Sequence, residues 1–273
     1  MTVTKKDIME TIKKSGLAKK CVCAHASLKS FGEIKGGADA VVAAFLESGC
    51  TLMAPAFSYS DYAVMPTEEY KYKRNGADYG NLWWIKHGNK AVYTQDSNAI
   101  DLKDMGRLPE AVLNTEGRVR GDHPLCSFAA TGPYAAELIK SQKPLDVYAP
   151  LRELALFEGC IVLIGVGLTK LTAIHLAEQM AGRNMFIRWA NGPDGKVIPA
   201  ECGGDSDGFE NLKPYAAQAE KKAACGQSQW RIFDTGKLLK SAARAIIMQP
   251  QITHCAKKDC LRCNDMTAGG PLI

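Results

Sequence analysis

Residues 160–182 form the stretch CIVLIGVGLTKLTAIHLAEQMAG, and the order of its parts decides the fold class. Five apolar residues, 160–164, predict a buried strand. A turn with two glycines, Gly165 and Gly167, follows it, and apolar side chains at helical spacing then predict a helix over about 171–180. A strand that passes through a glycine turn into a helix is typical of an α/β sheet, which binds ligands at the carboxyl ends of its strands.

This helix carries a histidine and a glutamate, His175 and Glu178, at a separation of three residues. Side chains three apart share one helix face and can touch. A carboxylate beside an imidazole fixes its tautomer and stabilises its charged form, as a general base requires. The alternative is a structural histidine beside a solvated glutamate, and the spacing alone does not decide between the two.

The segments before this stretch predict a layered α/β sheet. A helix is expected over 4–15, with Thr4 and Asp7 in the positions of a capping box, and the order strand, loop, helix, strand follows from residue 20 to residue 55. The pattern also predicts a strand at 127–130 and a hairpin at 185–199. Further helices are expected at 107–114, 134–140, 151–157 and 238–248.

The composition fits a globular protein, and we expect one α/β domain over residues 1–273. Hydrophobic residues make up 46% of the chain and charged residues 23%. No apolar run approaches the roughly 20 residues of a membrane span, and residues 1–7 lack the apolar core of a signal peptide. We therefore expect a cytoplasmic protein without a membrane partner. The net charge of +5 is spread without a basic block, which argues against nucleic acid and suits an anionic small ligand.

Residues 57–100 interrupt this pattern with a long segment rich in tyrosine, tryptophan and acidic side chains. A long, weakly periodic insertion in a compact domain is commonly functional. One hypothesis is a lid over a cationic substrate. The other is a surface excursion whose aromatic side chains pack on the domain, and the sequence supports both equally.

Two polar segments are candidates for contact with phosphate groups. The loop 25–32 offers Ser27, Lys29 and Ser30 between a strand and a helix, where hydroxyl and backbone N–H groups favour phosphate oxygens. The segment 118–127 offers arginine, which pairs with phosphate through two hydrogen bonds. The alternatives are a plain polar turn and a solvated loop that enters a strand.

The chain contains ten cysteines, and a disulfide framework is not expected in a chain of this length without an export signal. Cys255, Cys260 and Cys263 lie close together in the C-terminal segment 254–265, a spacing that suits a structural zinc ion. Free surface thiols are the alternative. The spacing leaves open whether a fourth ligand comes from His254, Cys202 or Asp205, and Cys202 is our working assignment.

Four stretches, taken together and in order, resemble the antibiotic N-acetyltransferase family, whose best-known members are aminoglycoside 3-N-acetyltransferases. They are residues 25–39, 51–57, 120–132 and 165–178. The resemblance implies a three-layer α/β/α sandwich with a mixed, largely parallel central sheet, and acetyl-coenzyme A as cosubstrate. It places Ser27, Leu28, Lys29 and Ser30 against the pyrophosphate and pantetheine of coenzyme A, and Arg120, Ser127 and Phe128 beside the same groove.

The resemblance also implies a reaction in which an acetyl group moves to an amine. His175, oriented by Glu178, would take the proton of the amine, and Ser127 or a backbone N–H near Gly167 would stabilise the oxyanion. Because aminoglycosides are polycations, acidic residues should face the acceptor. The residues expected on the acceptor side are Asp61, Tyr79, Glu178 and Asp205.

Three matters stay open at this stage. The acceptor can be an amine that is not an antibiotic, or the protein can be a zinc-stabilised module that binds coenzyme A without turnover. A homodimer is possible. Gly204-Asp205-Ser206 also stands where relatives often have Gly-Cys-Ser, so Asp205 is a candidate metal ligand, a candidate partner of His175, or neither.

Overall fold

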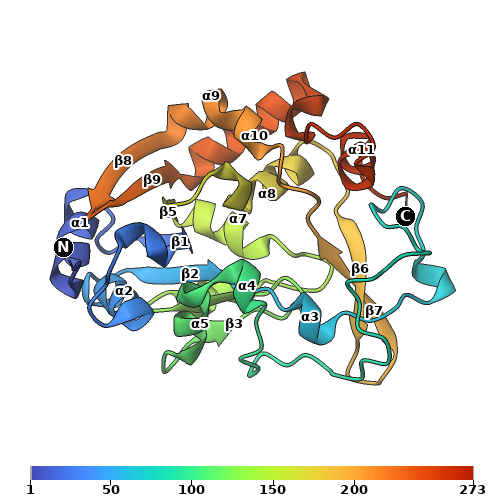
Figure 1. Cartoon of the computed structure of the whole chain (residues 1–273), viewed down its shortest axis with the longest axis horizontal. Coiled ribbons are helices and arrows are strands. Elements are labelled where there is room, and N and C mark those ends of the chain that lie inside the picture. Colours follow the sequence, from blue (N-terminus) through green and yellow to red (C-terminus); the bar gives the residue numbers. More distant parts are fainter. Residues whose placement is uncertain (1, 273) are drawn as a thin grey trace.

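The computed structural model describes residues 2–272 and confirms the three-layer α/β/α sandwich (Figure 1). Over this range the central sheet has seven strands in the order β3-β4-β2-β1-β5-β9-β8. A separate two-stranded sheet is formed by β6 and β7. The strands are β1 Cys21–Ala26, β2 Thr51–Pro55, β3 Val119–Arg120, β4 Phe128–Thr131, β5 Cys160–Ile164, β6 Phe186–Asn191, β7 Val197–Cys202, β8 Glu220–Cys225 and β9 Ser228–Asp234.

The central sheet is mixed, and most of its strands run in one direction. The middle strand, β1, pairs in parallel with β2 on one side and with β5 on the other. Strands β4 and β9 pair antiparallel with β2 and β5, and β3 and β8 pair antiparallel with these in turn. Five of the seven described strands therefore share a direction, as the sequence predicts for a largely parallel sheet.

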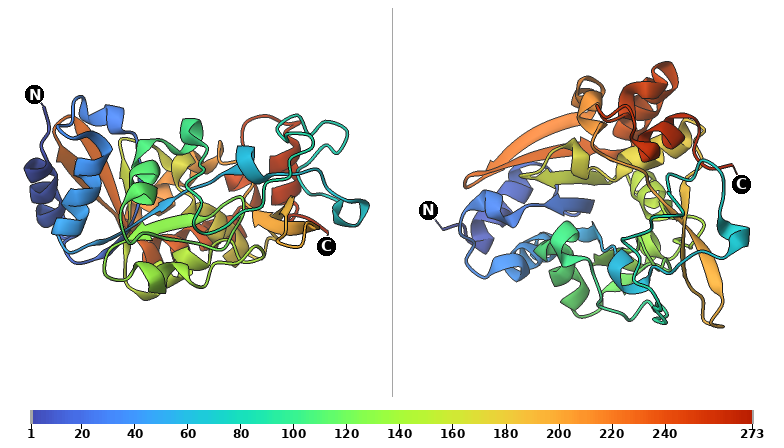
Figure 2. Two further views of the ribbon diagram at one scale, coloured as in Figure 1. Left: turned by 90° about the horizontal axis from the view of Figure 1, so that it is seen from below. Right: turned by 45° about the vertical axis from the view of Figure 1, so that its right-hand side comes forward.

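Helices cover both faces of the sheet because its buried side chains alternate between them (Figure 2). Val22 and Ala24 of β1 pack with the helices α1, α2 and α5, whereas Cys23 packs with the layer of α6, α7, α8 and α10. Successive side chains of a strand point to opposite faces, so each apolar strand supplies both cores. The helices are α1 Lys5–Lys14, α2 Gly37–Glu47, α5 Arg107–Asn114, α6 Ala135–Ile139, α7 Ala149–Leu156, α8 Ala173–Met180 and α10 Thr235–Met248.

The predicted helices and strands are confirmed, with ends that shift by a few residues. The capping box of α1 is also present: the Thr4 hydroxyl accepts from the N–H of Asp7, and the Asp7 carboxylate accepts from the N–H of Thr4. The hairpin of β8 and β9 was missed. Strand β8 lies at the edge of the sheet and exposes Lys221 and Lys222, so it lacks the apolar alternation that marks a strand.

The segment 57–100 runs beside the hairpin of β6 and β7 (Figure 1). Ala63 forms a bridge to Ala190, and the indole N–H of Trp189 donates to the carbonyl of Tyr70 at 3.1 Å. The segment contains α3 Tyr59–Tyr62 and the turn η2 Glu68–Tyr70. Most of its aromatic residues pack against the core, which confirms the packing part of the second hypothesis, whereas Trp83 is 83% exposed. The packed residues are Phe57, Tyr59, Tyr62, Tyr70, Tyr72, Tyr79, Trp84 and Tyr93.

Short helical segments complete the structure. They include η1 Leu28–Phe31 after β1, η3 Leu168–Lys170 after β5, and η4 Phe209–Leu212 and α9 Lys213–Ala216 before β8. The remaining short segments are α4 Leu102–Met105, η5 Ala217–Ala219, η6 Pro250–Thr253 and α11 Leu261–Thr267. Between residues 2 and 272, no helix has both the length and the apolar character needed to cross a membrane.

Candidate active site

The loops that follow β1 and β5 meet at the carboxyl edge of the sheet. Because these strands are parallel neighbours, their ends lie side by side, and the N–H of Ser27 donates to the carbonyl of Ile164 at 2.9 Å. Gly165 adopts a positive φ of 63°, and a Cβ added there would lie 2.2 Å from the Ser30 side chain. The glycine is therefore required both by its backbone conformation and by the close approach of the two loops.

The loop after β5 is held by a residue that the sequence did not point to. The carboxylate of Glu210, on η4, accepts a hydrogen bond from the N–H of Leu168 at 2.6 Å. The same carboxylate fills the space beside Gly167, where an added Cβ would lie 2.3 Å from an oxygen. This contact sets the path of the chain into α8, which carries the catalytic candidates.

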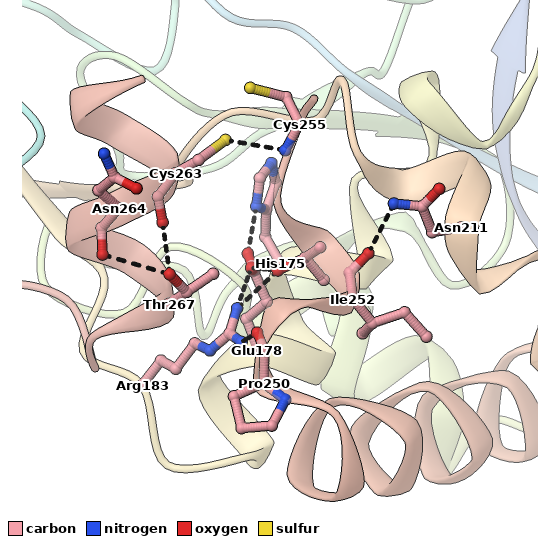
Figure 3. A network of polar contacts seen from close by, with 11 residues as sticks. His175, Glu178, Arg183, Asn211, Pro250, Ile252, Cys255, Cys263, Asn264 and Thr267 are labelled. Atoms are coloured by element: carbon pink, nitrogen blue, oxygen red, sulfur yellow. Dashed lines mark hydrogen bonds and ion pairs between the residues drawn. The ribbon is translucent and has the colours of Figure 1, made fainter. Parts of the chain in front are cut away.

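His175 and Glu178 form the predicted pair on α8. Nδ1 of His175 lies 2.9 Å from Oε2 of Glu178 (Figure 3). An ionised carboxylate only accepts hydrogen bonds, so Nδ1 carries the proton and Nε2 keeps its lone pair. Among the described residues nothing bonds to Nε2, and the residue is 8% exposed. The arrangement leaves one basic nitrogen available to a ligand.

Aromatic side chains hold the imidazole ring from two sides. Tyr148, next to α7, stacks on it with a centroid distance of 6.0 Å and an angle of 12°, and Phe209 meets it edge-on at 4.8 Å. Burial raises the pKa of Tyr148 above its usual value, so its phenol is neutral. A Cβ added at Gly203 would lie 2.6 Å from Cδ2 of His175. The ring therefore has little freedom to turn.

The second oxygen of Glu178 is also occupied. Oε1 accepts from Arg183 at 2.6 Å and from the hydroxyl of Thr253 at 2.9 Å. Burial lowers the pKa of Arg183, and the neighbouring carboxylate opposes that change. With both oxygens bonded and 1% of the residue exposed, Glu178 has no surface left for a substrate. The expectation that it also binds the acceptor is therefore wrong.

The four residues expected to contact coenzyme A lie at the open edge of the sheet. Ser27, Leu28 and Ser30 are half-buried and Lys29 is exposed. The N–H groups of Leu28 and Lys29, the first two of η1, have no hydrogen-bond partner among residues 2–272. Unpaired N–H groups at such a turn are suited to bind an anion.

Arg120, Ser127 and Phe128 are not available to a ligand, contrary to expectation. Arg120 is 1% exposed and donates to the Ser127 hydroxyl at 2.9 Å and to the carbonyls of Ser97 and Ala56, each at 2.7 Å. Ser127 and Phe128 are fully buried. The Ser127 hydroxyl donates to the carbonyl of Ala56 at 3.0 Å, so it is not available as the oxyanion donor.

The whole segment 118–127 has a structural role. Arg118 donates to carbonyl oxygens of residues 95–97. His123 accepts the N–H of Cys126 at Nδ1 and lies 2.8 Å from the carbonyl of Glu201 at Nε2. These side chains connect the segment 57–100 and β7 to the central sheet, and they do not form a phosphate site.

The acceptor-side candidates are dispersed. The Tyr79 hydroxyl donates to the carbonyl of Tyr72 at 2.7 Å, and its ring packs on Trp189. Asp61 is exposed on α3. Asp205 lies 3.7 Å from the sulfur of Cys260. Within the described range, no hydrogen bond or ion pair joins any of these three to His175.

The C-terminal cysteines do form a cluster, but Cys202 is not part of it. Ligand atoms of Asp205, Cys260 and Cys263 lie within 4.8 Å of one another, and so do those of His254, Cys255 and Cys263. Cys202 is buried in the core, where its sulfur lies 3.4 Å from that of Cys126. The assignment of Cys202 as a metal ligand is therefore wrong, because the pairing of β7 with β6 turns its side chain to the core.

The comparison with protein families agrees with the geometry. The family model described as aminoglycoside 3-N-acetyltransferase matches residues 23–246. The chain belongs to the aminoglycoside 3-N-acetyltransferase family. Strand β5, the pair on α8 and all of β1 except its first two residues fall in the matched part of the chain.

Curated relatives match part of the chain. Aminoglycoside N(3)-acetyltransferase IX of Micromonospora chalcea is 30% identical over 169 residues, which cover 58% of this chain and 54% of the relative. Aminoglycoside N(3)-acetyltransferase III of Salmonella sp is 29% identical over 185 residues, or 65% and 61% of the two chains. The chain thus spans less than two thirds of the length of these family members.

Solved structures of acetyltransferases share the fold. The apoenzyme of aminoglycoside acetyltransferase AAC(3)-IVa has a TM-score of 0.76 and 20% identity, with 98% of each chain covered. A binary complex of AAC-IIIb with CoASH has a TM-score of 0.71 and 20% identity, with coverage of 91% of this chain and 98% of that one. At these identities the likeness establishes the family fold for the present chain.

Proposed function

We propose that the protein transfers the acetyl group of acetyl-coenzyme A to an amine of an aminoglycoside, at the 3-amino position by analogy with its family. The observation that carries this proposal is the His175–Glu178 pair, in which the bond at Nδ1 leaves Nε2 free. A buried imidazole with one fixed and one free nitrogen is suited to remove a proton from a nucleophile.

The reaction needs two contributions from the protein. Nε2 of His175 accepts a proton from the amine, and Glu178 stabilises the imidazolium that results. The amine nitrogen bonds to the acetyl carbon, the carbon–sulfur bond breaks, and the departing thiolate takes the proton from the imidazolium to leave as the thiol of coenzyme A. Base catalysis supplies roughly 10²–10⁴-fold, and holding the two substrates together supplies much of the remainder.

The substrates are assigned to two sides of His175. Coenzyme A binds at the loop Ser27–Ser30, supported by the unpaired N–H groups of Leu28 and Lys29. A backbone N–H near Gly167 remains the candidate oxyanion donor. The acceptor lies toward the segment 57–100, where Asp61 is an exposed carboxylate suited to a polycation. A structure of an AAC(3)-IVa mutant in complex with a gentamicin supports this acceptor class.

A thiol-release assay tests the proposal. Coenzyme A release is followed with a thiol reagent for several aminoglycosides and simple amines. We expect turnover with aminoglycosides and a loss of roughly 10²–10⁴-fold in His175→Ala, with coenzyme A binding retained. Turnover only with other amines would replace the acceptor, and no thiol release with any amine would favour a binding module. Wild-type rates in His175→Ala would remove the histidine from the mechanism.

We also propose a structural zinc ion bound by Cys255, Cys260, Cys263 and Asp205. Three thiolates and a carboxylate are a suitable donor set for tetrahedral zinc. Of the candidate fourth ligands, Asp205 is favoured because both ring nitrogens of His254 are bonded, one to the carbonyl of Cys255 and one to Asn264.

Elemental analysis tests the zinc proposal. We expect one zinc per chain, lost in Cys260→Ser and retained in the matched control Cys202→Ser. A stable protein that contains no metal after expression with zinc would contradict the proposal, and metal loss in Cys202→Ser alone would contradict the choice of ligands.

A further inference from the structure

Glu178 is held by Arg183 and Thr253 in addition to His175. Oε2 faces His175, and Oε1 faces Arg183 (Figure 3). The hydroxyl of Thr253 also donates to Oε1. Arg183 follows the end of α8, and Thr253 ends η6, 75 residues beyond Glu178 in the chain. The carboxylate therefore connects two segments that the sequence keeps far apart.

The contacts form a closed set. A single guanidinium nitrogen of Arg183 donates to Glu178 at 2.6 Å and to the hydroxyl of Thr253 at 2.7 Å, and that hydroxyl donates to Glu178 at 2.9 Å. The other terminal nitrogen of Arg183 donates to the carbonyl of Pro250 at 2.5 Å. All three side chains are buried. Both terminal nitrogens of Arg183 and the hydroxyl of Thr253 thus donate either to Glu178 or to the segment that carries Thr253.

The burial of the Glu178 carboxylate explains why it needs these partners. A carboxylate taken out of water is stable as an anion only with a partner charge and hydrogen bonds. The terminal torsion of a glutamate is also soft, so an unrestrained carboxylate can rotate away from its partner. Arg183 supplies the charge, and the two donors on Oε1 prevent the rotation.

We propose that Arg183 and Thr253 are positioning residues that keep Oε2 of Glu178 directed at Nδ1 of His175. The chain that follows α10 then completes the catalytic site, since η6 supplies Thr253 and the carbonyl of Pro250. This inference rests on the proposed function of His175.

Among the described residues, the aromatic side chains that contact the imidazole carry no charge. From the start of α7 the phenol of Tyr148 faces the imidazole, and from η4 Phe209 does. Helix α10 packs on α8 through apolar side chains, while Lys240 and Arg244 are exposed. Loss of Arg183 would leave the Glu178 carboxylate buried without its partner charge and free to turn away from His175.

Four variants test the proposal, with kcat and the KM for acetyl-coenzyme A measured separately by thiol release. Arg183→Met should lower kcat roughly tenfold or more and leave this KM unchanged, because Arg183 positions the base and touches no substrate. Thr253→Val should lower kcat by about threefold to tenfold, also with an unchanged KM. Arg183→Lys and Thr253→Ser should restore kcat.

The matched control is Thr235→Val, which also removes a buried hydroxyl bonded to a carbonyl, that of Gly159 at 2.8 Å, away from His175. If Thr253→Val and Arg183→Met lower kcat no more than Thr235→Val does, or if Thr253→Ser fails to restore kcat, the proposal is wrong. If Arg183→Met does not fold, the comparison of Thr253→Val with Thr253→Ser decides. His175→Ala is measured in parallel: wild-type turnover there overturns the proposed function, whereas an inactive His175→Ala beside a normal Arg183→Met overturns this inference alone.

Discussion

Two buried histidines of this chain have opposite settings. At His123 both ring nitrogens are bonded, Nδ1 to the N–H of Cys126 and Nε2 to the carbonyl of Glu201, and the side chain is fully buried. At His175 one nitrogen is bonded to Glu178 and the other is free. The contrast teaches that a polar side chain can act on a substrate only where the fold leaves part of its hydrogen-bonding capacity unused.

Two cationic residues, Arg120 and Lys29, differ in the same way. The guanidinium of Arg120, close to His123 in the chain, donates to the carbonyls of Ala56 and Ser97 and to the hydroxyl of Ser127. Lys29, at the carboxyl edge of the sheet, is exposed and has no ion-pair partner among the described residues. We call the surroundings of His123 and Arg120 the closed region, and those of His175 and Lys29 the open region. Four experiments test this difference.

The largest effect is expected in the open region. Glu178→Gln keeps the size of the side chain but removes the charge that stabilises the imidazolium, so kcat should fall by roughly 10²–10⁴-fold. Thiol release is measured on protein whose folding is checked by circular dichroism, and coenzyme A affinity should not change. A fall of less than threefold would show that the pair is as structural as His123.

The next effect is on stability, in the closed region. Arg120→Met leaves buried carbonyl groups without a donor, so the free energy of unfolding should fall by about 3–5 kcal/mol. Urea denaturation measures the loss. The KM for acetyl-coenzyme A of the folded variant should stay within about twofold. A large rise in this KM would restore Arg120 as a cofactor contact.

A third prediction concerns acid. Burial holds the pKa of His123 at about 4, below the 6.5 of an exposed histidine. Between these pH values the unfolded chain binds a proton that the folded chain does not, so stability falls as the pH drops from 6.5 to 4, by roughly 3 kcal/mol. His25, whose pKa burial also holds at about 4, adds to the loss.

Urea denaturation at pH 7 and at pH 4.5 measures this dependence. His123→Asn, whose amide oxygen can replace Nδ1 as an acceptor, should show a weaker loss of stability in acid than the wild type. The same acid sensitivity in both proteins would contradict the assignment of His123 to the closed region.

The smallest effect is expected at Lys29. Because this ammonium group is exposed, Lys29→Ala should raise the KM for acetyl-coenzyme A by only about twofold to threefold and leave kcat unchanged. The difference should grow at low ionic strength, where screening is weaker. A change in kcat with an unaltered KM would place Lys29 outside the coenzyme A site.

The sequence by itself determined the features that depend on local spacing. Apolar runs and helical periodicity predict the strands β1, β2 and β5 and the helices between them. The spacing of Thr4 and Asp7 predicts the capping box of α1. The placement of His175 and Glu178 on one helix face follows from a separation of three residues. Each of these depends on neighbours along the chain, which the printed sequence shows directly.

The tertiary structure determines which polar groups form hydrogen bonds within the protein and which remain available to a ligand. Nothing in the spacing reveals that Arg120 meets Ala56, that Cys202 meets Cys126, or that Thr253 reaches Glu178. These partners lie 64, 76 and 75 residues apart. They are brought together by the packing of whole elements, and a hydrogen bond between them offsets the cost of burying a polar group.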